Sequence, residues 1–169
     1  FFDQVRVPGT RLLGGEGRGF VQLVEQLPQE RLIVAIRSTA IAEAALRWTV
    51  EYTNERQAFG RPIAGFQNTR FKLAEVQSNL LMLRVFVDKC IELLMAGELS
   101  AEDAAVAKLR STEIMSDTLD ECLQLHGGYG YMREYPIGRA WVDNRYARIA
   151  SGSSEIMKEI IGRNLTGQR

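Results

Sequence analysis

The residue best suited to do chemistry is a carboxylate, Glu30, in the segment L-P-Q-E-R at the front of a long apolar stretch. An acid two residues after a helix-starting proline lies in the first turn, where the helix dipole favours it. A carboxylate that enters a strongly apolar helix can also be partly desolvated, which makes it a candidate general base. Arg31 beside it could be a surface charge or could orient a ligand. Position alone leaves the two roles of Glu30 open.

A second polar segment, E-R-Q-A-F-G-R-P, begins at Glu55 and runs into a glycine-containing loop. Arg56 stands at a helix end, so its charge could face the last carbonyl groups of that helix. Its planar guanidinium could equally bind the oxygen pair of a pyrophosphate. Phe59 would flank such a ligand, and Gln67 offers amide hydrogen bonds. The residues alone favour neither reading.

Two further segments could bring backbone groups close to a ligand. The run Q-L-H-G-G-Y-G-Y, from Gln124 to Tyr131, has three glycines within four residues, which permits close approach of a ligand or another chain. It does not follow a strand, so it is not a dinucleotide fingerprint, and a lone His126 is expected to be structural. In A-S-G-S-S-E-I, Ser153 or Ser154 can cap the last helix, whose free amides form a possible anion site.

Composition excludes several classes of function. The chain has 169 residues, of which 46% are apolar, and balances 21 basic against 21 acidic side chains. A neutral chain is a poor partner for nucleic acid or an anionic membrane, and no apolar run approaches the roughly 20 residues that span a bilayer. Cys90, Cys122 and His126 are too few for a zinc site with four nitrogen or sulfur ligands, so no metal is expected. Two cysteines also indicate a reducing compartment.

The apolar spacing predicts an all-α fold. Four substantial helices with short connections indicate an antiparallel four-helix bundle. Pro28 should kink the first helix or begin a second segment there. A short turn is expected near Pro136. The predicted helices cover about residues 20–54, 67–95, 100–125 and 153–164.

The start of the chain predicts a strand rather than a helix. Phe2, Val5 and Val7 form a short β-like run that Pro8 stops. A lone strand cannot satisfy its ladder hydrogen bonds. We therefore expect residues 1–15 to be the last strand and linker of a β domain whose other strands precede this chain, with residues 16–169 forming the helical domain. An extended tail is the alternative.

Taken together and in this order, these segments resemble the C-terminal part of the acyl-CoA dehydrogenases. The segments that carry the resemblance are L-P-Q-E-R-L, E-R-Q-A-F-G-R-P, Q-L-H-G-G-Y-G-Y, E-Y-P and G-S-S-E-I-M-K-E-I-I-G-R-N-L. The resemblance spans nearly the whole chain and implies an FAD-dependent enzyme that oxidises an acyl-CoA thioester to the trans-2-enoyl-CoA. It also implies that electrons pass to an electron-transferring flavoprotein. The expected location is the bacterial cytoplasm or the mitochondrial matrix, without secretion.

The resemblance bears most directly on the base. Most members of the family place a catalytic glutamate in a Y-E-G-T stretch before the final helix, but the aligned stretch here is A-S-G-S, with Ser151 at that position. The long-chain and isovaleryl types place the base in the E-R pair of the first long helix instead. That pair is Glu30 and Arg31 here, so the resemblance assigns Glu30 as the base. The motif L-P-Q-E-R most resembles that of the long-chain type.

The resemblance also assigns the remaining site residues and an assembly. Pro28, Gln29, Arg31, Ser151 and Gly152 would line the substrate. The residues expected to contact FAD are Arg56, Phe59, Gln67, Gln124, Leu125, His126, Gly127, Gly128, Ser153, Ser154 and Glu155. Several of these would act on the cofactor of a neighbouring subunit, which implies a homodimer or homotetramer, and the chain alone is expected to be inactive. Two alternatives stay open: an acyl-CoA oxidase-like enzyme, and a helical assembly module without catalysis.

Overall fold

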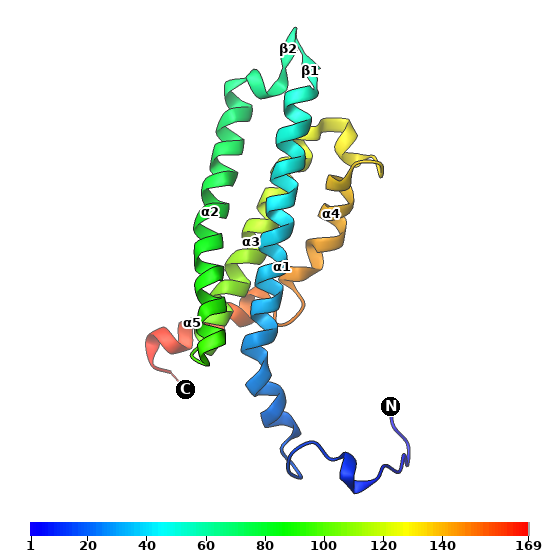
Figure 1. Ribbon diagram of the computed structural model, residues 1–169, viewed down its shortest axis with the longest axis vertical. Helices are drawn as coiled ribbons and strands as arrows, with labels where there is room; N and C mark the ends of the chain where they lie inside the picture. The colour runs from blue at the N-terminus through cyan, green and yellow to red at the C-terminus, as the bar shows by residue number, and fades with distance from the viewer. Residues whose placement is uncertain (169) are drawn as a thin grey trace.

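The computed structural model describes residues 1–168, and most of these residues are helical (Figure 1). Three long helices lie lengthwise beside one another, a shorter helix lies along them, and the last helix crosses one end. These helices are α1 Gly19–Glu55, α2 Gln67–Ala96, α3 Ala101–His126, α4 Pro136–Asn144 and α5 Ser154–Thr166. A small antiparallel hairpin, β1 Gln57–Ala58 and β2 Arg61–Pro62, closes the opposite end. The all-α prediction is confirmed.

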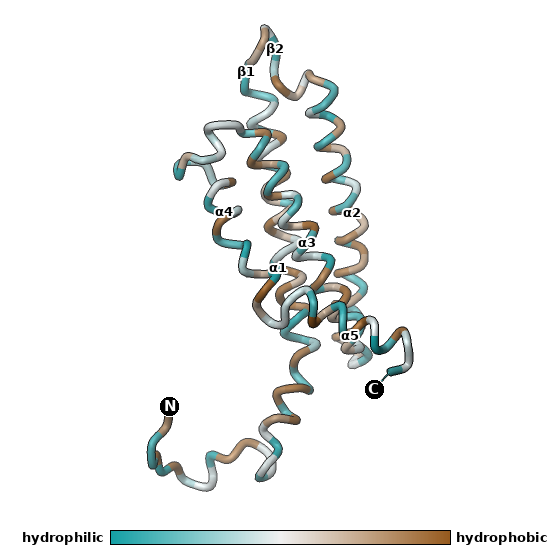
Figure 2. The backbone as a smooth tube through the Cα atoms, turned by 180° about the vertical axis from the view of Figure 1, so that it is seen from behind, coloured by the Kyte–Doolittle hydropathy of each residue, from teal (hydrophilic) through white to brown (hydrophobic). Residues whose placement is uncertain are grey.

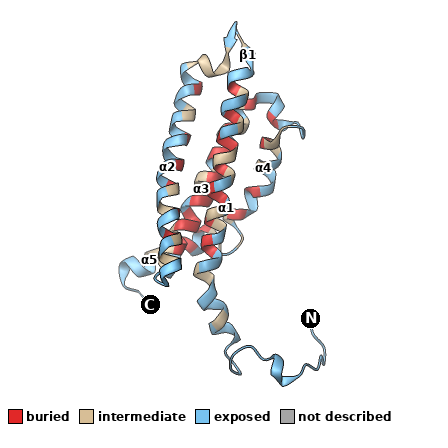
Figure 3. Cartoon of the chain, in the orientation of Figure 1, coloured by how far each residue is buried: buried red, intermediate tan, exposed pale blue. Residues whose placement is uncertain are grey.

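The core lies mainly between α1 and α3, where buried residues line the facing sides of the helices (Figure 3). Small residues of α1 such as Ala35, Ala42 and Ala45 are fully buried and let the two helices approach closely. Helix α2 adds one apolar face, with Leu80, Leu83 and Val87 buried. The positions recur at helical spacing, as the sequence predicts. This packing fixes the ends of α1 and α3 relative to each other.

Helix α1 continues through Pro28 without ending, so the expected second segment is not found. Proline removes one backbone hydrogen bond and its ring crowds the carbonyl group four residues earlier, so it is best accommodated where that carbonyl can reach water. The first turns of α1 meet this condition, because Phe20, Leu23 and Val24 are exposed and that segment projects beyond the bundle (Figure 2). Leu32 and Ala35 then anchor the helix in the core directly after the proline.

The segment near Pro136 is a nine-residue helix, α4, rather than the short turn that was expected. Proline is well suited to the first helical position because its φ angle is already helical. Ile137 is fully buried against the main core, and the side chain of Asn144 closes the helix by donating to Ala140 O at 2.7 Å. The expectation of a short turn was wrong, because tertiary packing stabilises this helix and the local sequence does not report that packing.

The strand expected at residues 2–7 is not formed within the described part of the chain, where β1 and β2 are the two strands present. A strand needs a neighbour to pair with, and residues 1–18 are exposed throughout. The assignment of residues 1–15 to a β domain therefore stays a prediction. None of the helices within residues 1–168 combines the length and the apolar character that crossing a membrane requires.

Replacing Leu32 with alanine is expected to lower the free energy of unfolding by about 2–5 kcal/mol, because Leu32 is fully buried and the substitution leaves a cavity. Leu81 on α2 is 60% exposed and serves as the matched control, with an expected change within about 0.5 kcal/mol. Urea unfolding followed by circular dichroism measures both. Equal losses for the two variants would contradict the placement of the core.

Candidate functional site

Glu30 lies on α1 well past the first turn, which begins at Gly19. The helix dipole acts only near the helix end, so the first-turn role expected for this carboxylate is wrong. Glu30 is exposed, whereas the next residue, Arg31, is only 7% exposed. Neighbouring helical residues face different directions, so Glu30 is available to a ligand while Arg31 packs against the bundle.

Arg31 is a buried guanidinium whose Nε atom has no hydrogen-bond partner among the described residues. Burial lowers its pKa from the ordinary value. Buried polar atoms normally have partners, so an unpartnered nitrogen beside the candidate base is an unusual feature. It belongs to the segment that the family resemblance assigns to the substrate.

A loop before α5 comes to this same end of the bundle, beside α1 (orange in Figure 1). Lys108 of α3 is fully buried, and its Nζ donates to Gly152 O at 2.5 Å. Burial lowers the pKa of Lys108, the nearby Arg31 charge lowers it further, and Glu155 opposes the shift. The structure therefore brings Arg31, Lys108 and the loop at residues 151–152 together from three separate elements.

The start of α5 differs in detail from the expected cap. Ser153 is the N-cap residue, but its side chain makes no cap hydrogen bond. Its hydroxyl instead interacts with Glu155, and the pKa of that exposed carboxyl is lowered first by its own backbone N–H and then by Ser153. Ser154 is buried, and its Oγ has no hydrogen-bond partner within residues 1–168. The expected side-chain cap is therefore wrong, and Ser154 keeps an unused polar atom.

A second group of predicted residues surrounds a hollow of about 420 Å³ at the other end of the bundle. The hollow is lined by Tyr52, Arg56, Ile63, Met132 and the run Gln124, Leu125, His126, Gly127, Gly128 and Tyr129. The Arg56 guanidinium lies 5.3 Å from the centre of the Tyr129 ring, a cation–π contact. A side chain added at Gly127 or Gly128 would meet no atom within 4 Å, so the backbone here faces open space.

His126 is held by its own structural contacts, as expected for a lone histidine. Its Nδ1 is 2.8 Å from Cys122 O, and its ring stacks on Tyr52 with centroids 4.3 Å apart. The Tyr52 hydroxyl donates to His126 O at 3.1 Å. Burial lowers the pKa of His126, which favours the neutral ring. His126 is thus held in place as one of the residues that line the hollow.

Phe59 and Gln67 are near the hairpin rather than inside the hollow. Phe59 is 96% exposed in the turn between β1 and β2, with a left-handed φ of 51° and an edge-to-face contact to Phe66. Gln67 is exposed at the first position of α2. Neither side chain is among the residues that line the hollow around Gln124–Gly128, so their assignment to a shared ligand stays a prediction.

The two groups of predicted residues lie far apart within one chain. Arg31 lies on α1, and Arg56 directly follows the last residue of that helix, Glu55. A rise of about 1.5 Å per residue separates the two arginines by about 37 Å. The hairpin and α5 correspondingly mark opposite ends of the bundle (Figure 1). The Glu30 region and the Arg56 region are therefore two separate surfaces of the chain.

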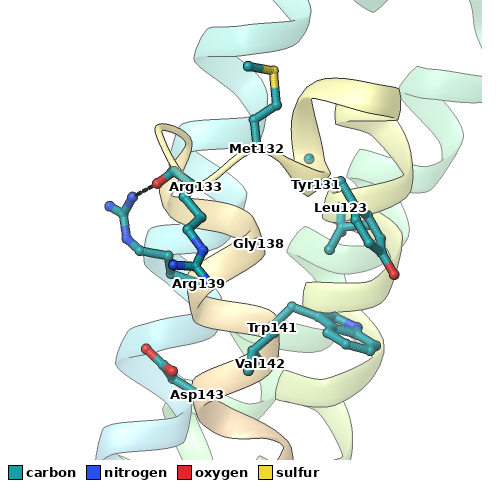
Figure 4. A pocket seen from close by; sticks show the side chains of 10 residues that line it. Leu123, Tyr131, Met132, Arg133, Gly138, Arg139, Trp141, Val142 and Asp143 are labelled. Carbon is teal, nitrogen blue, oxygen red and sulfur yellow. Dashed lines mark hydrogen bonds between the residues drawn. The ribbon is translucent and has the colours of Figure 1, made fainter.

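A further hollow of about 410 Å³ lies between α3 and α4 (Figure 4). Trp141, Tyr131 and Met132 line it, and Arg139 donates to the backbone oxygen of Arg133 at its edge. Gly130 and Tyr131, at the end of the run that begins at Gln124, reach this hollow, whereas none of the residues assigned to the substrate or to FAD lines it. No group of three His, Cys, Asp or Glu side chains within residues 1–168 is placed to hold a metal ion.

Lys108 is the main site residue that the sequence analysis missed. It stands in the run A-A-V-A-K-L, where Ala104, Ala105, Ala107 and Leu109 are all buried. A single charge inside an otherwise apolar face of a helix is the signal that could have identified it, since lysine is almost never fully buried without a partner.

Comparison with known proteins agrees with this architecture. Residues 17–166 match the family described as acyl-CoA dehydrogenase, C-terminal domain. The long-chain specific acyl-CoA dehydrogenase of Rattus norvegicus mitochondria is 42% identical over 165 residues, which are 98% of this chain and 38% of that protein.

Two solved structures have the same fold. An acyl-CoA dehydrogenase of Geobacillus kaustophilus is 44% identical with a TM-score of 0.94, covering 98% of this chain and 43% of that one. A glutaryl-CoA dehydrogenase of Mycobacterium smegmatis in complex with FADH2 is 26% identical with a TM-score of 0.81, covering 84% of this chain and 37% of that one. The chain thus spans about two fifths of the length of these relatives. With most of its residues matched to the C-terminal domain, the chain belongs to the acyl-CoA dehydrogenase family.

Proposed function

We propose that this chain is the helical part of an FAD-dependent acyl-CoA dehydrogenase in which Glu30 is the general base. One observation carries the proposal: Glu30 is an exposed carboxylate on α1, while the loop before α5 has Ser151 at the position where most of the family has glutamate. Arg31, next to Glu30, and Gly152, next to Ser151, both lie close to Lys108. Of the two positions where the family places its base, only the one on α1 carries a carboxylate here.

In the proposed reaction, a carboxylate oxygen of Glu30 takes the α-proton of the acyl-CoA thioester. The Ser151 hydroxyl cannot do this, because a neutral alcohol is far too weak a base for a carbon-bound proton. Ser151 instead leaves room opposite Glu30, and Pro28, Gln29 and Gly152 line the thioester. When bound, FAD supplies the hydride acceptor for the β-hydrogen, which gives the trans-2-enoyl-CoA.

The residues around the hollow lined by Arg56 and Gln124–Tyr129 fit the anionic part of FAD. Arg56 presents an exposed guanidinium, suited to paired phosphate oxygens, and the open backbone at Gly127 and Gly128 permits close approach. The unpartnered Ser154 Oγ at the other end fits a group that can hydrogen-bond. The Arg56 region and the Ser154 region lie at opposite ends of the bundle, too far apart to form one continuous binding surface. This separation supports the proposal that Arg56, Phe59, Gln67 and Gln124–Gly128 act on the FAD of a neighbouring subunit.

This arrangement makes a homodimer or homotetramer part of the proposal, and the 169-residue chain alone is proposed to be inactive. The proposed electron acceptor is an electron-transferring flavoprotein, and the proposed location is the bacterial cytoplasm or the mitochondrial matrix. Anaerobic and aerobic assays of the intact protein test the function. Reduction of a flavoprotein-coupled dye by acyl-CoA without oxygen consumption supports it. Oxygen-dependent turnover indicates an oxidase, and a colourless protein that takes up no FAD indicates an assembly module.

Replacing Arg56 with glutamine is expected to weaken FAD binding by roughly 10- to 150-fold, because a hydrogen bond to a charged group contributes about 1.5–3 kcal/mol. Flavin fluorescence titration of the intact apoprotein measures the dissociation constant. Arg47, an exposed arginine on α1, gives the control variant Arg47→Gln, which should bind FAD as the wild type does. Unchanged FAD affinity in Arg56→Gln would remove Arg56 from the cofactor site.

A further inference from the structure

Lys108 is buried to an extent that its neighbours do not explain. It has no exposed surface, yet the one hydrogen bond that its amine makes within residues 1–168 goes to a neutral carbonyl oxygen, Gly152 O, rather than to a carboxylate. Taking an ammonium out of water is costly unless it is paired. The nearby positive charge of Arg31 disfavours the charged form of Lys108, and Glu155, whose negative charge favours that form, is exposed to solvent. A methionine would fill the same space at less cost, so the amine has a role that packing does not require.

The group that Lys108 holds is a backbone in an unusual conformation. Ser151 and Gly152 have successive positive φ angles of 55° and 95°. Such conformations are unfavourable for residues with a side chain and persist when the surroundings hold them. A Cβ atom at Gly152 would come within 2.7 Å of Met157 Cε. The loop is therefore fixed on one side by α5 and on the other by the amine of α3.

This loop is the surface that faces the thioester in the proposed function, on which the inference rests. We propose that Lys108 is a positioning residue: its amine holds the Ser151–Gly152 backbone in the conformation that places the α-carbon of the acyl-CoA against Glu30. The contact joins α3 to the loop across 44 positions of sequence. Displacing that backbone by about 1 Å would move the reacting atoms out of line, which lowers turnover by about 100-fold in well-positioned sites.

The test compares Lys108→Met and Lys108→Gln in the intact, FAD-loaded protein. Methionine keeps the length of the side chain and removes the donor, while glutamine keeps a donor. We expect Lys108→Met to slow anaerobic flavin bleaching at saturating acyl-CoA by about 10- to 100-fold, with a smaller change in the acyl-CoA concentration that gives half-maximal rate. Lys108→Gln should bleach faster than Lys108→Met. A role in packing alone would alter thermal unfolding and FAD content without this order of rates.

Two further variants distinguish a positioning role of Lys108 from a role in packing alone. Thr112 is buried one turn further along α3, and within residues 1–168 its hydroxyl donates to the backbone oxygens of Lys108 and Leu109, not to the loop. Thr112→Val should therefore change unfolding without changing the bleaching rate. Gly152→Ala disturbs the loop while leaving the amine in place and should slow bleaching as Lys108→Met does, which keeps the test valid if Lys108→Met does not fold. Normal bleaching in Lys108→Met, or in Gly152→Ala where Lys108→Met fails to fold, would overturn the inference. Absence of bleaching in the wild type with every acyl-CoA tested would overturn the proposed function instead.

Discussion

Replacing Glu30 with glutamine is expected to lower the turnover number of the intact protein by about 10²- to 10⁴-fold, the range that a positioned general base contributes. Glutamine has nearly the same shape but cannot accept the α-proton. Because Glu30 is exposed in the chain, the substitution should leave the fold and the FAD content unchanged. Steady-state oxidation of acyl-CoA with a dye as acceptor measures the effect.

Glu25 provides the matched control for this prediction. It is an exposed acid on the same projecting part of α1, with a loose ion pair to Arg18 at 3.9 Å. Glu25→Gln should retain wild-type turnover, because surface pairs of this kind contribute little. Glu30→Asp should fall between the wild type and Glu30→Gln, since it keeps the carboxylate but shortens its reach. Equal turnover for Glu30→Gln and Glu25→Gln would exclude Glu30 as the base.

The second large effect is a recovery of activity when the carboxylate is moved to the loop. In the Glu30→Gln background, Ser151→Glu is expected to raise turnover by at least about tenfold, because two backbones flank the same reacting carbon. Full recovery is not expected, since a small misplacement of the base costs up to about 100-fold. The exposed position of Ser151 leaves space for the longer side chain.

Ser151→Gln in the same background is the control, because it adds the same bulk without a carboxylate. The pair of double variants is compared at several pH values to ensure that the recovered rate depends on an ionised group. If the Glu and Gln versions at position 151 are equally slow, the loop does not face the α-carbon and the proposed placement of the substrate is wrong.

The long helices could be predicted from sequence because their apolar spacing is local information. The expected helices at 67–95 and 100–125 are observed as Gln67–Ala96 and Ala101–His126. Local rules failed at both prolines: they predicted a kink or a new segment at Pro28 and a short turn near Pro136. The first lies inside a helix whose later turns are anchored in the core, and the second begins a helix that depends on packing of Ile137. Tertiary contacts decided both cases.

The chemical types of the site residues could be predicted from sequence, but their environment could not. Nothing near Lys108 in sequence shows that its amine meets Gly152 O, because that contact depends on how α3 packs against the loop before α5. The same holds for the unpartnered atoms of Arg31 and Ser154. The distance between Arg31 and Arg56 follows from the unbroken length of α1, which the proline obscured.

Anaerobic mixing of the FAD-loaded intact protein with a panel of acyl-CoAs tests the central claim most directly, because flavin bleaching in a single turnover reports proton and hydride removal without the acceptor. We predict rapid bleaching in the wild type and at least about 100-fold slower bleaching in Glu30→Gln with every acyl-CoA in the panel. A wild-type bleaching rate in Glu30→Gln would contradict the account.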